Sequence, residues 1–243
     1  MAQAVGPSFS VIVPVLGEDD RINQLVDHVR TVGYGRNLEI IVADGHPRCT
    51  TLTALDRPGV LKLACPIGRA RQMNAAAVLA KGRVLVFLHA DTNLPAGAFE
   101  AMEMVLADPG KAGGAFNLGI RSSRLSLKLI AWVASLRSRL TRLPYGDQAI
   151  FLRREAFAAV NGYRDLPILE EVDLMRRLRR AKMSIGFAKG RTATSPRRWE
   201  TEGVWRRTAR NWLISLLYWL GVSPARLRGM HPPHANTNPE KQP

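Results

Sequence analysis

Short apolar runs alternate with amphipathic stretches along the first 90 residues. Apolar runs bounded by turn residues predict buried strands, whereas apolar residues three or four positions apart predict helices. The predicted strands cover residues 9–15, 38–42, 60–63 and 84–88, and the predicted helices between them cover 19–31, 49–55 and 68–81. Strands separated by helices of this length indicate right-handed crossovers and a mostly parallel sheet, so the predicted fold class is α/β.

The pattern is less regular in the second half of the chain. It predicts helices over residues 98–106, 125–140, 154–160 and 170–180, strands over 113–118 and 149–153, and a last amphipathic stretch over 204–220. From Met230 onward the chain is rich in Pro, His and Asn and has no apolar period, which predicts disorder. We therefore expect a single domain over residues 8–228, followed by a disordered tail over 229–243.

Acidic residues follow three of the predicted strands. Asp91 comes shortly after the apolar run 84–88, Glu18 follows the first strand, and Asp44 follows the second. The carboxyl ends of the strands in an α/β sheet border the crevice in which such folds bind ligands. These three carboxylates therefore predict a functional site at one edge of the sheet, with Asp91 as its most informative residue.

Net charge and cysteine content narrow the expected partners and location. The formal net charge is +15 and is carried mostly by Arg, which favours nucleotides, nucleic acid or an anionic membrane, although a compositional habit of the genome explains it equally well. Cys49 and Cys65 have no metal-ligand spacing. No signal-peptide pattern and no apolar run of about 20 residues is present, so we expect a cytoplasmic protein without a transmembrane helix.

Six motifs in order along the chain resemble those of the family 2 glycosyltransferases. They are residues 10–18 (SVIVPVLGE), 39–45 (EIIVADG), 88–92 (LHADT), 146–148 (GDQ), 169–174 (LEEVDL) and 195–199 (SPRRW). The resemblance implies an inverting enzyme of the GT-A type, with a Rossmann-like, mostly parallel sheet flanked by helices and with C-terminal amphipathic helices. It is closest to a short, soluble bacterial subgroup. It also implies a nucleotide-sugar-binding half over residues 8–95 and an acceptor-binding half over 96–228.

The resemblance assigns the donor side of this site to the first half. Asp44 would bind the base of a nucleoside diphosphate sugar, and Pro14 and Glu18 would line the same cleft. Arg69 and Asn74 match a basic residue and an asparagine that the family places near the diphosphate, and the start of a helix suits such an anion. The alternative for Asp44 is a structural role in a turn before Gly45. The alternative for the segment that begins at Arg69 is a helix start whose arginines are solvated.

Asp91 stands where the family holds a divalent metal. The usual motif is Asp-x-Asp, in which oxygen ligands bind Mg²⁺ or Mn²⁺ and the metal neutralises the diphosphate. In this chain the first acid is replaced by His89. Histidine is a poor ligand for Mg²⁺ and a tolerable one for Mn²⁺. We therefore expect Asp91 to be the metal ligand, and the role of His89 stays open.

The pair Glu170-Glu171 stands where the family has Glu-Asp. Inversion requires a general base that deprotonates the acceptor hydroxyl, and the second acid of the pair performs this role in relatives. The match assigns the base to Glu171, with Glu170 as the second choice. The extra methylene of Glu171 displaces the carboxylate by about one bond length, which matters because catalysis is sensitive to displacements of ~1 Å. The alternative is two acids that stabilise a helix N-terminus.

Two further motifs are assigned to substrate binding. The resemblance gives Gly146, Asp147 and Gln148 to the donor sugar or the acceptor, with a plain turn as the alternative. It also gives Arg197, Arg198 and Trp199 to the diphosphate or acceptor, where Arg would offset leaving-group charge and Trp would stack on a sugar. A cationic surface segment is the alternative there.

The combined prediction is transfer of a sugar from a nucleoside diphosphate sugar to a hydroxyl or carboxylate acceptor, with a lipid or carotenoid-like acceptor as one option. The amphipathic stretches predict peripheral contact with an anionic membrane, at the inner face of the cell membrane. Two rivals are a sugar-1-phosphate nucleotidyltransferase and a non-catalytic basic module that binds membranes or nucleic acid. The acidic segment after the first strand disfavours the former. The three strand-end acids disfavour the latter, so nucleic acid is not an expected partner.

Overall fold

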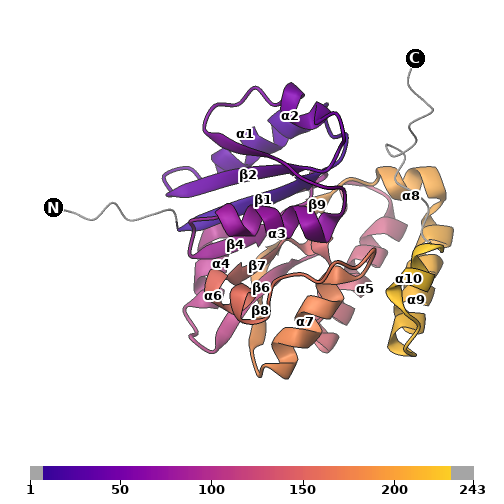
Figure 1. The fold of residues 1–243 in the computed structure, drawn as a ribbon. Coiled ribbons are helices and arrows are strands. Elements are labelled where there is room, and N and C mark those ends of the chain that lie inside the picture. Colours follow the sequence, from indigo (N-terminus) through magenta and orange to yellow (C-terminus); the bar gives the residue numbers. More distant parts are fainter. Residues whose placement is uncertain (1–7, 231–243) are drawn as a thin grey trace, which may run out of the picture.

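The computed structural model describes residues 8–230, in which seven strands form a central sheet with the order β3-β2-β1-β4-β7-β6-β8 (Figure 1). The strands are β1 (Phe9–Val15), β2 (Leu38–Asp44), β3 (Val60–Ala64), β4 (Val84–Phe87), β6 (Lys111–Asn117), β7 (Ile150–Arg153) and β8 (Ser184–Arg191). All neighbours pair in parallel except β7, which is antiparallel to both β4 and β6. The predicted mostly parallel α/β sheet is therefore confirmed.

Helices cover both faces of this sheet (Figure 1). Apolar residues of α1 (Ile22–Val32) and α4 (Ala98–Leu106) pack on one face. Those of α3 (Arg69–Leu79), α6 (Arg154–Ala159) and α7 (Glu170–Arg180) pack on the other. The remaining helices are α2 (Thr50–Ala54), α5 (Leu125–Thr141), the short 3-10 helix η1 (Gly146–Gln148), α8 (Arg197–Glu202), α9 (Val204–Trp219) and α10 (Pro224–Arg228).

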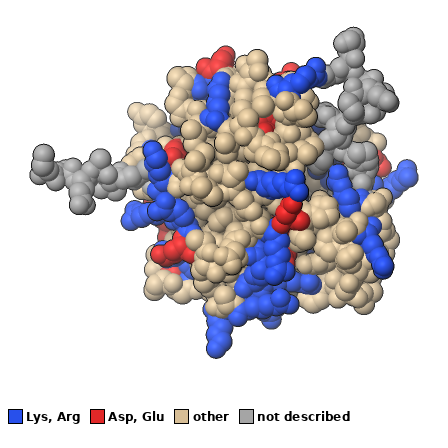
Figure 2. Space-filling model, viewed as in Figure 1, with Lys and Arg blue, Asp and Glu red and all other residues tan. Residues whose placement is uncertain are grey.

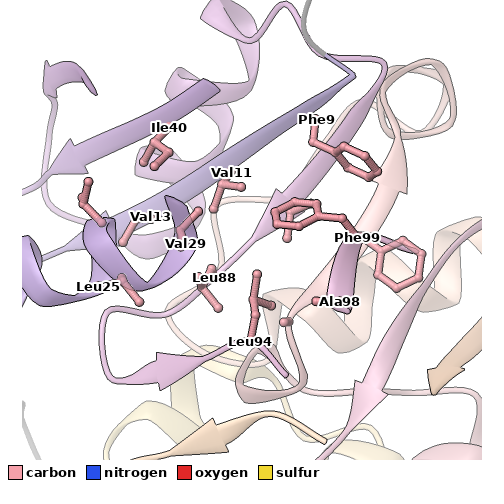
Figure 3. Packing of buried hydrophobic residues seen from close by; sticks show 14 of the residues in the cluster. Phe9, Val11, Val13, Leu25, Val29, Ile40, Leu88, Leu94, Ala98 and Phe99 are labelled. Carbon is pink, nitrogen blue, oxygen red and sulfur yellow. The ribbon is translucent and has the colours of Figure 1, made fainter. Parts of the chain in front are cut away.

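Alternate residues of each strand enter the two cores, as the period of an extended chain requires. Val11 and Val13 of β1 contribute to the core beneath α1 and α4, where the ring of Phe99 packs edge-on against Phe9 (Figure 3). Ile12, between the two valines, faces the opposite core. Because both faces of β1 are fully buried, its sequence is a continuous apolar run, which explains why the pattern predicted this strand with its correct bounds.

The carboxyl ends of β1 and β2 are joined by a side chain of α3. The buried amide of Gln72 donates from Nε2 to the carbonyl oxygens of Val15 and Ala43, at 2.6 and 2.7 Å. A β-carbon at Gly45 would lie 3.0 Å from Cδ of Gln72, so a glycine there leaves room for this amide. The bonds fix the edge of the sheet at which the strand-end acids lie.

The structure corrects the sequence prediction in the C-terminal third. Strand β8 and helix α8 were not predicted, and neither was the short strand pair β5 (Thr92–Asn93) with β9 (Ala193–Thr194). This pair brings a distant segment to the sheet edge, where the amide of Ser195 donates to the carbonyl oxygen of Asp91 at 3.0 Å. Helix α1 begins at Ile22 rather than at residue 19, because the amides of Arg21 and Ile22 both bond to the carbonyl of Glu18 in a turn.

Two other expectations concern membranes and the tail. Within residues 8–230, no helix is both long and apolar enough to cross a bilayer. The tail predicted to be disordered falls almost entirely in residues 231–243, outside the described part of the chain.

Candidate active site

Two cavities meet at the carboxyl edge of the sheet. The first, here called the larger cleft, has a volume of about 530 Å³ and is bordered by Pro14, Glu18, the start of α3 and the loop before α7. The second, here called the Glu171 pocket, has a volume of about 160 Å³ and is bordered by Glu171, η1 and parts of α8 and α9. The side chains that border both cavities are those of Arg69, His89, Asp91, Ile168 and Arg198.

Asp91 follows β4 and lies at the junction of the two cavities. The hydroxyl of Thr92 donates to Oδ1 of Asp91 at 3.2 Å. Burial by itself would raise the pKa of Asp91, but the charges of His89 and Arg198 outweigh burial, so this pKa is lowered. Asp91 is therefore a carboxylate that keeps its negative charge in a partly buried position. That property suits a residue that faces a cation.

The residues around Asp91 fit only one type of metal site. Within the described residues, no group of three or more His, Cys, Asp or Glu side chains is arranged to hold an ion. The described part of the chain therefore does not provide an all-protein cage. A single carboxylate beside a cleft fits Mg²⁺ or Mn²⁺ that takes its other ligands from substrate phosphates and water, which is the usual way in which Mg²⁺ is held. His89 lies beside Asp91, on the same two cavities.

Glu170 and Glu171 begin α7 and are both buried. Arg69, the first residue of α3, contacts both acids: its Nε donates to Oε1 of Glu170, and its terminal nitrogen lies 3.4 Å from Oε1 of Glu171. Burial raises the pKa of Glu171 to about 7, with a contribution from Glu170 and against the opposing charge of Arg69. A carboxylate with a pKa near neutrality can take a proton from a hydroxyl group at physiological pH.

The backbone of η1 lies directly against Glu171. A β-carbon at Gly146 would stand 2.5 Å from Oε1 of Glu171 and 2.4 Å from Nε2 of His89. These two side chains are themselves 3.9 Å apart between Nε2 and Oε1. Only a residue without a side chain leaves Glu171 in this position, which is a steric reason for the glycine of the GDQ motif.

The other two residues of the GDQ motif have different surroundings. Asp147 borders the Glu171 pocket, and its pKa is raised to about 6 because burial and the charge of Asp91 outweigh the charge of Arg137. Gln148 is buried: its Oε1 accepts from the hydroxyl of Ser138 at 2.6 Å, and its Nε2 donates to the carbonyl of Phe116 at 2.8 Å. Asp147 is thus available to a ligand in the pocket, whereas Gln148 holds η1 against the sheet.

Two residues assigned to the donor side do not border the larger cleft. The carboxylate of Asp44 is fully buried and accepts from the amides of His46 and Leu52, at 2.8 and 3.3 Å. The amide of Asn74 makes two bonds with the backbone of Tyr163, at 2.7 and 2.9 Å. In this structure both side chains therefore hold neighbouring loops in place. Glu18 does face the cleft, and burial and the charge of Asp91 raise its pKa.

Helix α8 brings the C-terminal motif to the site. Arg198 borders both cavities and Trp199 borders the Glu171 pocket, while Arg197 is exposed and borders neither. Sequence reasoning missed Arg207, which was interpreted as part of a polar surface on the helix over 204–220. Its guanidinium instead lies 5.0 Å from the centre of the Trp199 ring, pairs with Glu202 at 2.6 Å, and borders the pocket.

Positive charge surrounds these cavities. Arg69 and Arg198 border both of them, Arg71 borders the larger cleft, and Arg207 borders the pocket. Figure 2 shows further Lys and Arg side chains gathered over the region of α7, whose last turn carries Arg177, Arg179 and Arg180. The site therefore combines a buried proton acceptor with groups that stabilise an anionic ligand or leaving group.

Comparisons with protein-family models and with solved structures both find glycosyltransferases. The family model described as "Glycosyl transferase family 2" matches residues 10–157. A mannosyltransferase from Pyrobaculum calidifontis, PcManGT, solved with GDP-Man and Mn²⁺, shares 20% identity and a TM-score of 0.63 over 93% of this chain and 68% of its own. A comparison with curated proteins finds no match.

Two more structures are similar at lower identity. Glucosyl-3-phosphoglycerate synthase from Mycobacterium tuberculosis, solved with phosphoglyceric acid, has 18% identity and a TM-score of 0.55 over 78% of this chain and 72% of its own. TarS 1–349 from S. aureus, solved with UDP-GlcNAc, has 12% identity and a TM-score of 0.57 over 77% of this chain. This chain spans 58% of that TarS structure. At these identities the likeness shows a common fold.

Proposed function

Because this chain belongs to glycosyl transferase family 2, we propose that it transfers a sugar from a nucleoside diphosphate sugar to a hydroxyl or carboxylate group of an acceptor, with inversion at the anomeric carbon. The donor occupies the larger cleft and the acceptor enters the Glu171 pocket. Residues 8–95 provide most of the walls of the larger cleft, and residues after 96 provide most of the walls of the pocket. This distribution supports a donor-binding half followed by an acceptor-binding half.

The walls of the larger cleft suit a nucleoside diphosphate. Gly68 and Arg69 begin α3, whose free backbone amides and helix dipole favour an anion. Arg71 and Arg198 add positive charge from two sides of the cleft. Asp91 is the residue that would hold Mg²⁺ or Mn²⁺, which when bound supplies positive charge to the departing diphosphate. Two similar structures were solved with GDP-Man and with UDP-GlcNAc, which supports this class of donor without choosing the nucleotide.

The observation that carries the proposal is the position of Glu171. It is a buried carboxylate with a pKa of about 7, and it faces a pocket that joins the larger cleft at Asp91. When the acceptor is an alcohol, Oε1 of Glu171 takes the hydroxyl proton as that oxygen forms a bond to the anomeric carbon. The bond between this carbon and the diphosphate oxygen breaks at the same time, and its electron pair leaves with the nucleoside diphosphate. An acceptor that approaches from the pocket meets the carbon on the face opposite the departing group, which gives inversion.

The acceptor side supports a molecule with an apolar part. Helix α9 borders the Glu171 pocket and α5 packs beside α9, and both helices carry exposed Trp and Leu side chains together with Lys or Arg. Such helices lie in the interface of anionic membranes. We therefore include in the proposal a lipid or carotenoid-like acceptor and a peripheral contact with the inner face of the cell membrane.

The direct test is a screen of donor turnover. Purified protein is incubated with Mn²⁺ and each member of a panel of UDP-, GDP-, dTDP-, ADP- and CDP-sugars, and release of the nucleoside diphosphate is measured with and without an acceptor mixture. We expect one nucleotide class to be hydrolysed slowly without acceptor and faster with it. Turnover of none of the sugars, or release of a nucleoside monophosphate and sugar phosphate instead, contradicts the proposal.

A further inference from the structure

A third cavity of about 220 Å³ lies between α5 and α9 and is here called the α5–α9 chamber. Its walls include Ile130 and Ala134 of α5, and Trp212 and Leu216 of α9. They are predominantly apolar, unlike the walls of the larger cleft. The chamber is bordered by several residues that also border the Glu171 pocket: Tyr145, Asp147, Trp199, Asn211 and Ser215. An apolar cavity therefore adjoins the pocket that holds the base.

Trp199 stands between the two cavities with an unused hydrogen-bond donor. The residue is only 7% exposed, and within residues 8–230 its indole Nε1 has no hydrogen-bond partner. Burying an N–H group without a partner costs free energy, so such groups in folded proteins are normally satisfied. A ligand that extends from the pocket into the chamber would bring an oxygen atom that can accept a hydrogen bond from this N–H.

The chamber opens at the molecular surface. Three of its wall residues, Trp212, Leu216 and Trp219, are also 55, 57 and 59% exposed, so they form its mouth. The facing helix α5 also carries a row of exposed apolar side chains at helical spacing, on another face than Ile130 and Ala134. The row consists of Leu125, Leu129, Trp132, Leu136 and Leu140. Neither α5 nor α9 contains an acidic residue, and the exposed basic side chains of the two helices are Lys128, Arg139 and Arg206. An apolar mouth on two cationic helices complements an anionic lipid surface.

We propose that the α5–α9 chamber binds the apolar chain of a membrane lipid whose polar end is the sugar acceptor. This inference rests on the proposed glycosyl transfer and names the class of its acceptor. The polar end lies in the Glu171 pocket beside Trp199, and the chain passes between the helices to the bilayer. The chamber is somewhat larger than the cavity of about 150 Å³ that holds benzene in an engineered protein. It therefore takes only the first part of a chain, and the rest leaves through the mouth at Trp212, Leu216 and Trp219 into the bilayer.

Binding of n-alkyl β-D-glucosides tests the chamber without knowledge of the natural acceptor. Methyl, butyl, hexyl and octyl glucoside are titrated below their micelle concentrations, and binding is followed by calorimetry and by the fluorescence of the tryptophans that border the chamber. Each buried methylene should strengthen binding by up to about fourfold, which corresponds to ~0.8 kcal/mol, and the increase should continue from butyl to octyl. Affinity that is independent of chain length overturns the proposal. An increase that stops at butyl indicates a closed chamber for a small group, and it overturns the assignment to a lipid.

A pair of matched substitutions locates the binding. Ala134→Phe fills the chamber, whereas Ala209→Phe adds the same ring on α9 at an exposed position that borders none of the three cavities. The first variant should weaken octyl glucoside binding at least tenfold, and the second should leave it within twofold of the unsubstituted protein. Ala134→Leu adds less volume and serves if the Phe variant does not fold. Unchanged binding in a folded Ala134 variant overturns the proposal.

The two proposals fail in different ways. Hydrolysis of the donor in the absence of acceptor depends on the larger cleft, which no residue of the chamber borders. Donor hydrolysis without chain-length-dependent glucoside binding contradicts the chamber alone. Chain-length-dependent binding in a protein that turns over no nucleoside diphosphate sugar contradicts the proposed function and leaves a lipid-binding chamber.

Discussion

The α-carbon of Gly146 lies so close to the carboxylate of Glu171 that a β-carbon at this glycine would stand 2.5 Å from Oε1. The same β-carbon would meet Nε2 of His89 at 2.4 Å. Gly146→Ala should therefore displace the base, and we expect turnover to fall by about 10²-fold, because an error of ~1 Å in a catalytic group is costly. Steady-state kinetics measure the effect, and a thermal melt shows that the fold is retained.

Gly229→Ala is the control for this substitution. A β-carbon at Gly229 would meet only the carbonyl of Arg226, at an ordinary contact distance of 3.6 Å. This variant should keep the turnover of the unsubstituted protein. Full activity in Gly146→Ala shows that the close approach does not position the base.

The pKa of Glu171 predicts the pH dependence of turnover. Burial raises this pKa from 4.5 to about 7, so Glu171 is protonated and inactive as a base below that pH and becomes ionised as the pH rises through it. With saturating donor, kcat should rise with pH, reach half of its maximum near pH 7 and then level off. Asp147 has a raised pKa of about 6 and titrates nearby. Asp147→Asn should therefore retain the rise with a somewhat lower midpoint, because the charge of Asp147 contributes to the raised pKa of Glu171. A kcat that does not vary between pH 5 and 8 contradicts the role given to Glu171.

Asp91→Asn tests the metal site. An amide keeps the size of the side chain but removes the charge that attracts a divalent cation. We expect the Mn²⁺-dependent part of nucleotide binding to be lost in calorimetric titrations, with little change in the melting temperature. Because no three acidic, His or Cys side chains of residues 8–230 are arranged to hold an ion, Mn²⁺ alone should bind weakly to the unsubstituted protein as well.

Asp165→Asn is the matched control, since Asp165 is an exposed carboxylate on the same cleft and pairs with Arg71 at 2.6 Å. It removes the same charge and should retain metal-dependent binding. Normal Mn²⁺ dependence in Asp91→Asn excludes Asp91 as the ligand.

The first half of the fold was predictable because β1, β2 and β4 are mostly buried on both faces. Apolar runs with turn residues on each side fixed these strands, and also the exposed edge strand β3, to within two residues. Strand β8 escaped prediction because Ser184, Lys189 and Arg191 are exposed and two glycines break its pattern. Its place at the edge of the sheet leaves one side unpaired and allows these polar residues.

The site was predictable as a set of residues but not as an arrangement. The order of the motifs predicted a common site for Asp91, Glu171 and Arg198, and in the structure all three border the Glu171 pocket. The resemblance places Arg69 at the diphosphate, and in the structure its guanidinium also contacts Glu170 and Glu171 of α7. Arg69 and Glu170 are 101 residues apart in the chain. No local pattern encodes a pair of residues so far apart. Arg207 was missed for the same reason, because only packing against Trp199 distinguishes it from the neighbouring Arg206, which is exposed on α9.

Helix α9 should bring the protein to anionic membranes. It carries exposed Trp and Arg side chains and no acidic residue. Each basic residue near an anionic surface contributes ~1 kcal/mol, and salt screens this attraction. We expect flotation with vesicles that contain phosphatidylglycerol at low salt and its loss at high salt.

A pair of exposed aromatic residues makes this test specific. Trp205→Ser removes an exposed side chain of α9 that borders none of the three cavities, and Tyr34→Ser removes an exposed one that follows α1. The first should reduce flotation several-fold and the second should not. If the unsubstituted protein fails to float at low salt, the membrane contact is wrong.

The most direct test of the account compares Glu171→Gln with Glu170→Gln in transfer from the donor that the sugar-nucleotide screen identifies. Both acids are buried at the start of α7 and both contact Arg69, but only Glu171 borders the pocket assigned to the acceptor. We predict that Glu171→Gln lowers kcat by about 10²–10⁴-fold, the usual contribution of a general base, with little change in donor affinity, and that Glu170→Gln lowers it less. A larger loss of kcat in Glu170→Gln, or near-normal turnover in Glu171→Gln, contradicts the account.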